Sequence, residues 1–111
     1  YEHRTKSLRE WFIRRILRRP LFVEDLRSVW SFIAKDSEAQ ADRFVHELEA
    51  RYRILAERPL LGAKRFQAHP EIRLFPFRRY LIIYQPLDTG DGIELIRLPH
   101  AARDYRRFFD D

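Results

Sequence analysis

The sequence predicts one α+β domain with the order β-α-α-β-β-β-(α), in which a helical hairpin packs on a small, mostly antiparallel sheet. Between Leu21 and Ala56 the apolar residues recur with the period of an α-helix. Between Pro70 and Leu98 they change to the alternating register of strands, and prolines and glycines mark the joints. A length of 111 residues, 45% of them hydrophobic, suits a single domain with its own core.

The chain opens on a polar, basic stretch. We expect residues 1–11 to form an N-terminal extension and residues 12–111 to form the domain. The first strand is expected at residues 12–17, a short stretch rich in branched apolar side chains. Pro20 follows, and proline is tolerated in the first turn of a helix.

Two amphipathic helices are expected next. The first begins near residue 21, and its apolar face comprises Phe22, Leu26, Val29, Trp30 and Ile33. Glu24 and Asp25 are expected in its first turn, where the helix dipole favours negative charge. The second helix starts after Ser37, which has the form of an N-cap, and Pro59 and Gly62 end it. The short joint between the two helices predicts an antiparallel hairpin.

Three strands are expected in the second half. A short strand around Ile72 and Leu74 is expected to bend at Pro76. Residues 79–85 are interpreted as a central strand, because both of their faces are apolar. Residues 88–92 form a hairpin loop, and residues 93–98 return antiparallel. A short helix or arm is expected at residues 101–109.

The formal charge of +5 is unevenly distributed. Residues 1–20 carry all of it, so residues 21–111 are neutral in sum. Within that neutral body, residues 21–61 have a net charge of −2, residues 62–109 a net charge of +4, and Asp110 and Asp111 supply the remaining −2. The basic balance is therefore poor evidence that the whole domain binds nucleic acid. The positive sheet-and-arm half is the better candidate for a binding surface.

Several classes of protein are excluded by composition. Zero cysteine excludes disulfides, thiol nucleophiles and cysteine-based zinc sites, and it agrees with a cytoplasmic protein. The four histidines have no ligand spacing, so neither a metal nor another cofactor is expected. The longest apolar run, residues 80–84, is far too short to span a bilayer. No glycine-rich phosphate loop is present.

Polar candidates gather on the strands and the C-terminal arm. Alternation is expected to bring Arg73 and Arg97 together on the sheet face that the helices leave open. Two interpretations remain: a solvated face with salt bridges to Asp104 or Glu94, or a surface for an anion, a nucleic acid or an acidic partner. The wider candidate set is Arg73, Arg78, Arg79, Arg97, His100, Arg103, Asp104, Tyr105, Arg106 and Arg107.

Five short motifs follow one another in a fixed order across about residues 13–105. They are "DL..VW.FIA", "AD.F...L", "P..G", "IR.FP..RYLI.Y" and "R..H..RD". Each is weak alone, but together they resemble the ParE branch of the ParE/RelE toxin superfamily. The resemblance implies the toxin of a bacterial type II toxin–antitoxin module, with a helical hairpin on a small sheet.

The resemblance also implies partners. A ParD-type antitoxin would bind the toxin in a hetero-oligomeric complex, using a ribbon-helix-helix part for operator DNA and an acidic or amphipathic tail for the toxin. ParE-like toxins poison DNA gyrase, whereas RelE-like toxins cleave messenger RNA in the ribosome. No membrane partner is implied. Candidate residues for toxicity or antitoxin binding are Arg73, Arg79, Arg97, His100, Arg103 and Asp104.

The residues favour the non-enzymatic branch of the superfamily. The positions that match the basic residues of the RelE-like nuclease motif are Arg73, Glu71, Leu81 and Ala101. Only the first of them is basic in this sequence, so most of the positive charge of the nuclease centre is missing. Such a centre stabilises a phosphoryl-transfer transition state poorly. We therefore expect a gyrase inhibitor with no assigned catalytic residue. The alternatives are a ribosome-dependent endoribonuclease using Arg73, His100, Arg103 and Tyr105, or an inactive toxin-like corepressor.

Overall fold

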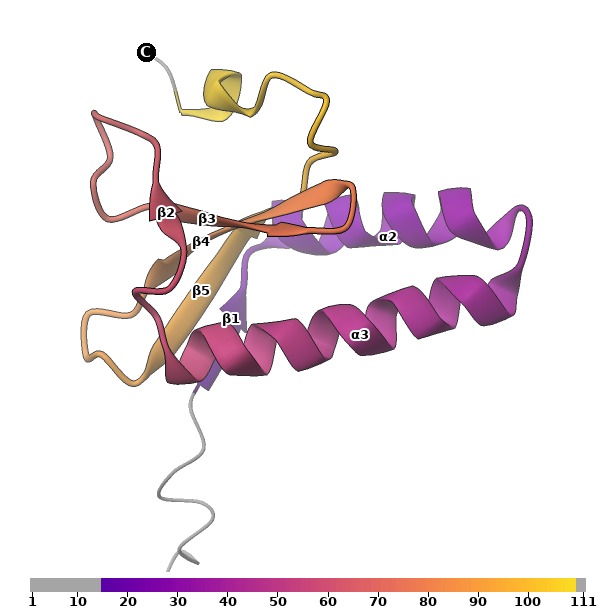
Figure 1. Cartoon of the computed structure of the whole chain (residues 1–111), viewed down its shortest axis with the longest axis horizontal. Helices are drawn as coiled ribbons and strands as arrows, with labels where there is room; N and C mark the ends of the chain where they lie inside the picture. The colour runs from indigo at the N-terminus through magenta and orange to yellow at the C-terminus, as the bar shows by residue number, and fades with distance from the viewer. Residues whose placement is uncertain (1–14, 110–111) are drawn as a thin grey trace, which may run out of the picture.

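The computed structural model describes residues 15–109, and a five-stranded sheet organises them (Figure 1). The elements are β1 (Arg15–Arg18), α2 (Pro20–Ala34), α3 (Glu38–Glu57), β2 (Ala63–Lys64), β3 (Arg73–Phe77), β4 (Tyr80–Pro86), β5 (Gly92–Arg97) and the 3₁₀ helix η1 (Tyr105–Phe108). The strand order is β1-β5-β4-β3-β2, with β1 parallel to β5 and all other pairs antiparallel. The α+β class and the element order are confirmed, with β2 as an unpredicted addition.

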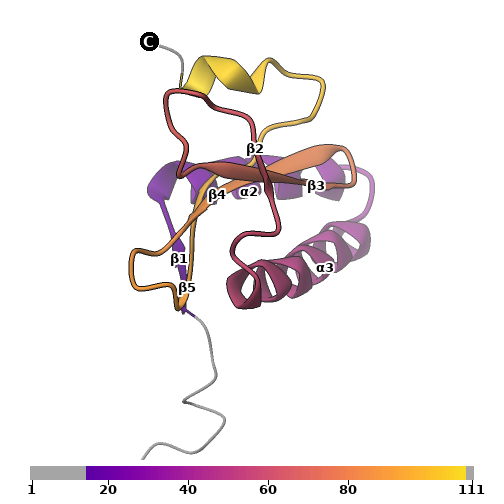
Figure 2. The same cartoon turned by 60° about the vertical axis from the view of Figure 1, so that its left-hand side comes forward.

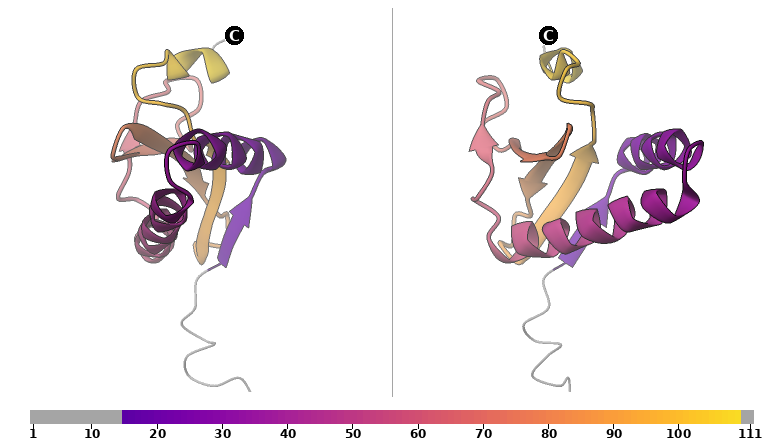
Figure 3. Two further views of the ribbon diagram at one scale, coloured as in Figure 1. Left: turned by 90° about the vertical axis from the view of Figure 1, so that its right-hand side faces the viewer. Right: turned by 45° about the vertical axis from the view of Figure 1, so that its right-hand side comes forward.

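The helices cover one face of the sheet, and the C-terminal arm, residues 99–109, lies over the other (Figures 1 and 2). The far end of the helical hairpin projects beyond the sheet (Figure 3). Of the expected first strand, residues 15–17 are confirmed, whereas residues 12–14 and the expected extension lie outside the described residues. Neither helix of the described chain is long and apolar enough to cross a membrane.

The N-terminal ends of both helices follow local rules. Pro20 is the first residue of α2, where its missing N–H costs nothing. Because the helix begins there, Glu24 and Asp25 lie beyond its first turn, and the expected dipole contact is wrong. The Ser37 hydroxyl accepts a hydrogen bond from the Gln40 amide at 3.1 Å, which confirms the predicted N-cap of α3.

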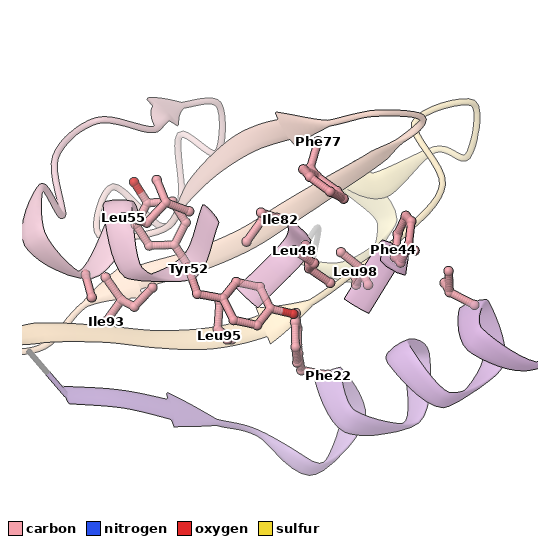
Figure 4. Close-up of a cluster of buried hydrophobic side chains, with 13 residues drawn as sticks. Phe22, Phe44, Leu48, Tyr52, Leu55, Phe77, Ile82, Ile93, Leu95 and Leu98 are labelled. Carbon is pink, nitrogen blue, oxygen red and sulfur yellow. The ribbon is translucent and has the colours of Figure 1, made fainter. Parts of the chain in front are cut away.

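Two apolar clusters lie on opposite faces of the sheet. The helix-side cluster is shown in Figure 4 and includes Phe22, Phe44, Leu48, Tyr52, Leu55, Phe77, Ile82, Ile93, Leu95 and Leu98. The arm-side cluster contains Phe66, Ile72, Leu74, Leu81, Ile83 and Ile96, and the aromatic side chains of the arm pack against it. Strand β4 supplies residues to both clusters, so its prediction as a central strand is confirmed.

Two irregularities shape the sheet. Strand β3 continues through Pro76, so the expected bend is wrong. The proline is tolerated because β2 pairs only with Arg73 and Leu74, so no backbone hydrogen bond from residue 76 to β2 is required. Between β4 and β5, Ile83 pairs with Arg97 while Tyr84 pairs with Leu95, so a β-bulge leaves Ile96 as the extra residue.

Candidate functional site

Arg73 and Arg97 lie on opposite faces of the sheet, which contradicts the expectation that they meet. Arg73 is paired with Tyr84, a residue of the helix-side cluster, and directly paired residues share a face. Arg97 is paired with Ile83 of the arm-side cluster. The bulge at Ile96 causes this, because the extra residue reverses the alternation that would have kept Arg97 on the helix side.

Arg97 joins three parts of the fold. Its Nε and Nη2 donate to the two carboxylate oxygens of Asp25 on α2 at 2.8 and 3.1 Å. The same carboxylate accepts from the Leu98 amide at 2.9 Å, and the two charged side chains are only 19% and 17% exposed. The guanidinium also lies 4.1 Å from the ring centroid of Phe108 in the arm. Arg97 is therefore held by the protein itself and offers little to a partner.

One interpretation of the sequence places the strand arginines in salt bridges to Glu94 or Asp104, but Arg97 pairs with Asp25 and Arg73 binds backbone carbonyls. Glu94 pairs instead with Arg19 at 3.1 Å and accepts from the side-chain Nε2 of Gln85 at 2.9 Å. The hydrogen bond from Arg19 is the main reason that the pKa of Glu94 lies below its ordinary value. Asp104 caps η1 by accepting a hydrogen bond from the Arg106 amide. Both carboxylates thus have local structural roles.

The four nuclease candidates do not form one centre. His100 bridges Tyr80 at one end of β4, with ring centroids 5.3 Å apart, whereas Arg73 pairs near the other end. Four residues of strand separate the two positions, or about 13 Å. Arg103 shares a backbone turn with His100 through a 3.0 Å hydrogen bond, but its guanidinium lies over Phe108. The Tyr105 ring packs edge-on against Phe66 at 5.8 Å. Residues 15–109 also contain no cluster of three His, Asp or Glu side chains that could hold a metal ion.

An open groove of about 490 Å³ lies between the far end of the helical hairpin and the β3–β4 turn. We call it the hairpin groove. Aromatic and aliphatic side chains alternate with arginines along its walls, and Phe32 is 67% exposed. Its lining comprises Phe32, Ile33, Asp36, Gln40, Arg43, Phe44, Arg78, Arg79 and Tyr80. Sequence reasoning placed only Arg78 and Arg79 among the candidates and missed the helical wall.

The β3–β4 turn is fastened to α3 by Arg78. Its guanidinium pairs with Glu47 and lies 5.8 Å from the Phe44 ring and 5.7 Å from the Phe77 ring. Arg78 has a φ of 54°, a left-handed conformation that a non-glycine residue adopts at a cost of about 1 kcal/mol. Such a conformation persists only where the surroundings hold it. The turn therefore holds Arg78 and the neighbouring Arg79 in a defined place at the edge of the hairpin groove.

Comparison with known proteins supports the motif analysis. Residues 16–105 match the family model of the ParE toxin of type II toxin-antitoxin system, parDE. The fold is similar to the solved structure of the "Chromosomal ParDE TA system from P. aeruginosa", with a TM-score of 0.63 and 14% sequence identity over 80% of this chain and 97% of that chain. At that identity, the structural likeness bears on the fold alone. No curated protein matches the chain.

Proposed function

Because the chain belongs to the family of ParE toxins of type II toxin–antitoxin systems, we propose that it inhibits DNA gyrase by binding it and is neutralised by a ParD-type antitoxin. The separation of Arg73 from His100 along β4 carries the non-enzymatic part of this proposal. A phosphoryl-transfer centre needs its cations within reach of one substrate atom. In this chain Arg73 is instead committed to the backbone carbonyls of Leu60 and Gly62 at 3.1 and 2.8 Å.

The hairpin groove supports the antitoxin part of the proposal. Its apolar lining residues suit the apolar face of an amphipathic segment. Arg43 and Arg79 line it besides Arg78, which pairs with Glu47, and Asp36 is the one acidic residue among the described residues that line it. An acidic antitoxin segment would therefore find both apolar contact and charge complementarity there. Operator DNA would be reached through the antitoxin, and the pair would act in the cytoplasm.

The gyrase proposal is tested with toxin purified from its antitoxin complex. We expect the toxin to inhibit supercoiling or raise the level of gyrase–DNA cleavage complexes, and added antitoxin to restore activity. Growth arrest with unchanged gyrase activity would count against the proposal. New cleavage sites in translated messages, mapped by primer extension, would support the endoribonuclease alternative. Normal growth without antitoxin would support the corepressor alternative.

The groove proposal is tested by Phe32→Asp, with Leu21→Asp as the matched control. Both residues are exposed and lie on α2, at 67% and 52%, but Leu21 lies outside the hairpin groove. An aromatic anchor contributes about 2 kcal/mol, so we expect Phe32→Asp to weaken antitoxin binding about 30-fold in calorimetry. The control should bind like wild type. Equal affinities of the two variants would refute the placement of the antitoxin in this groove.

A further inference from the structure

The loop between α3 and β2 presents two adjacent leucines to solvent. Leu60 is 69% exposed and Leu61 is 45% exposed, and Ile54 in the last turns of α3 is 43% exposed. Single exposed apolar residues are ordinary on protein surfaces, but neighbouring ones form a patch that a partner can cover. We call Leu60 and Leu61 the leucine patch.

This loop is held by side chains from the sheet. The hydroxyl of Tyr84, a fully buried residue of β4, donates to the Pro59 carbonyl at 2.9 Å and accepts from the Gly62 amide at 2.7 Å. The Arg73 guanidinium donates to the carbonyls of Leu60 and Gly62. Four hydrogen bonds therefore fix a short loop from which Leu60 and Leu61 are exposed.

Gly62 adds a steric constraint to the same loop. A Cβ at this position would lie 2.5 Å from the Tyr84 hydroxyl oxygen and 2.9 Å from the Leu74 carbonyl oxygen, so only glycine allows this close approach. The leucines are thus exposed in a fixed arrangement. Binding through a preorganised apolar pair avoids much of the ordering entropy that a mobile loop would lose.

The charges around the leucine patch indicate the chemistry of the partner. Arg58 and Lys64 flank the loop in sequence, with Glu57 next to Arg58, and the Arg73 guanidinium donates to two carbonyls of the loop. A second copy of this chain would bring the same positive charge to the contact and be repelled. A protein with an apolar recess flanked by carboxylates is complementary.

We propose that the leucine patch is the surface through which this toxin contacts its target protein. This inference rests on the proposed function and adds to it which residues make the contact. Gln40 and Arg43 of the hairpin groove lie near the N-terminal end of α3, whereas the leucine patch lies at its C-terminal end, about 20 Å or more away along the helix. Target contact and antitoxin contact are therefore separable by mutation.

The test uses the double variant Leu60→Ser/Leu61→Ser, with Leu21→Ser as a matched exposed-leucine control. Growth arrest after induction, binding to immobilised gyrase subunits, antitoxin affinity and thermal unfolding are measured for each. We expect the double variant to lose growth arrest and to bind gyrase about 30-fold more weakly, the loss typical of a contact centre. Its unfolding temperature and antitoxin affinity should match those of the wild type and the control.

The outcomes separate this inference from the function on which it rests. A double variant that arrests growth like wild type overturns the inference, as does one that loses antitoxin affinity alone. If wild type arrests growth without binding gyrase, the proposed target is wrong, and growth arrest by the variant still decides whether the patch matters. A wild-type chain that neither arrests growth nor binds gyrase overturns both proposals.

Discussion

Replacing tyrosine by phenylalanine at two buried positions is expected to change stability in opposite directions. Tyr52 and Tyr84 are 1% and 0% exposed, and both lie in the helix-side cluster. The Tyr84 hydroxyl makes two hydrogen bonds with the α3–β2 loop. The Tyr52 hydroxyl has no hydrogen-bond partner among residues 15–109. The same chemical change therefore removes two interactions at one site and only an unpaired polar group at the other.

The magnitudes follow from these contacts. In Tyr84→Phe, two hydrogen bonds of about 1 kcal/mol each are lost and the Gly62 amide is left without its partner, so the free energy of unfolding should fall by about 2–4 kcal/mol. Tyr52→Phe removes a buried hydroxyl without a hydrogen-bond partner among the described residues and with it the desolvation cost of that group, so the free energy of unfolding should rise by about 1 kcal/mol. Burial raises the pKa of both phenols for the same physical reason.

Urea unfolding followed by circular dichroism measures both effects. With an m-value of about 1–3 kcal/mol per molar urea, the midpoint should fall by about 1–2 M for Tyr84→Phe and rise slightly for Tyr52→Phe. Unchanged m-values are required for the comparison to report stability alone. Equal losses in the two variants, or a loss above about 1 kcal/mol for Tyr52→Phe, would refute the reasoning from hydrogen-bond satisfaction.

Three further predictions concern single contacts. Gly62→Ala should lower the free energy of unfolding by about 2–3 kcal/mol, because the added Cβ meets the Tyr84 hydroxyl. Gly90→Ala should lower it by only about 1 kcal/mol, because Gly90 has a φ of 79° but no atom of the described chain within 4 Å of the added Cβ. Equal losses in chemical denaturation would contradict the steric argument. Arg78→Gly should be more stable than Arg78→Ala by about 1 kcal/mol, because both variants lose the ion pair with Glu47 but only glycine adopts the positive φ without strain. Thermal unfolding measures the difference, and a higher unfolding temperature for the alanine variant would disprove the prediction. The pKa of Glu94 is lowered in the folded state, so its stabilising contribution is present above the ordinary value of 4.5 and is lost as pH falls through the lowered pKa. In a series of unfolding midpoints measured against pH, Glu94→Gln should therefore reduce the loss of stability at acid pH. An unaltered loss would show that the ion pair with Arg19 contributes nothing.

Much of the fold could be predicted from local patterns. The helical hairpin follows from the apolar period of α2 and α3 and from Ser37, whose hydroxyl caps the second helix within its own segment. Strand β4 was recognisable because a strand buried on both faces is apolar at consecutive positions. These features depend on neighbouring residues alone, so the sequence pattern contains them.

The parts that could not be predicted depend on pairing between distant segments. The bulge at Ile96 exists only in the register between β4 and β5, and it moves Arg97 to the other face of the sheet. Strand β2 has two residues, too few to show any period. The one available signal for the hairpin groove was Phe32, a large apolar residue off the apolar face of its helix. Strict alternation therefore placed Arg73 and Arg97 on one face, whereas the structure places Arg73 on the helix side and Arg97 on the arm side.

The parallel pairing of β1 with β5 has a consequence for how the toxin is made. Arg15 pairs with Gly92, so the β1 edge of the sheet closes only after all the elements between them have been synthesised. Contacts between residues so distant in sequence form late, because the loop-closure entropy must be overcome first. On the ribosome, the helical hairpin emerges before β3, β4 and β5, so the part of its apolar face that these strands bury remains uncovered in the interval. Folding of this domain is thus coupled to the synthesis of β5.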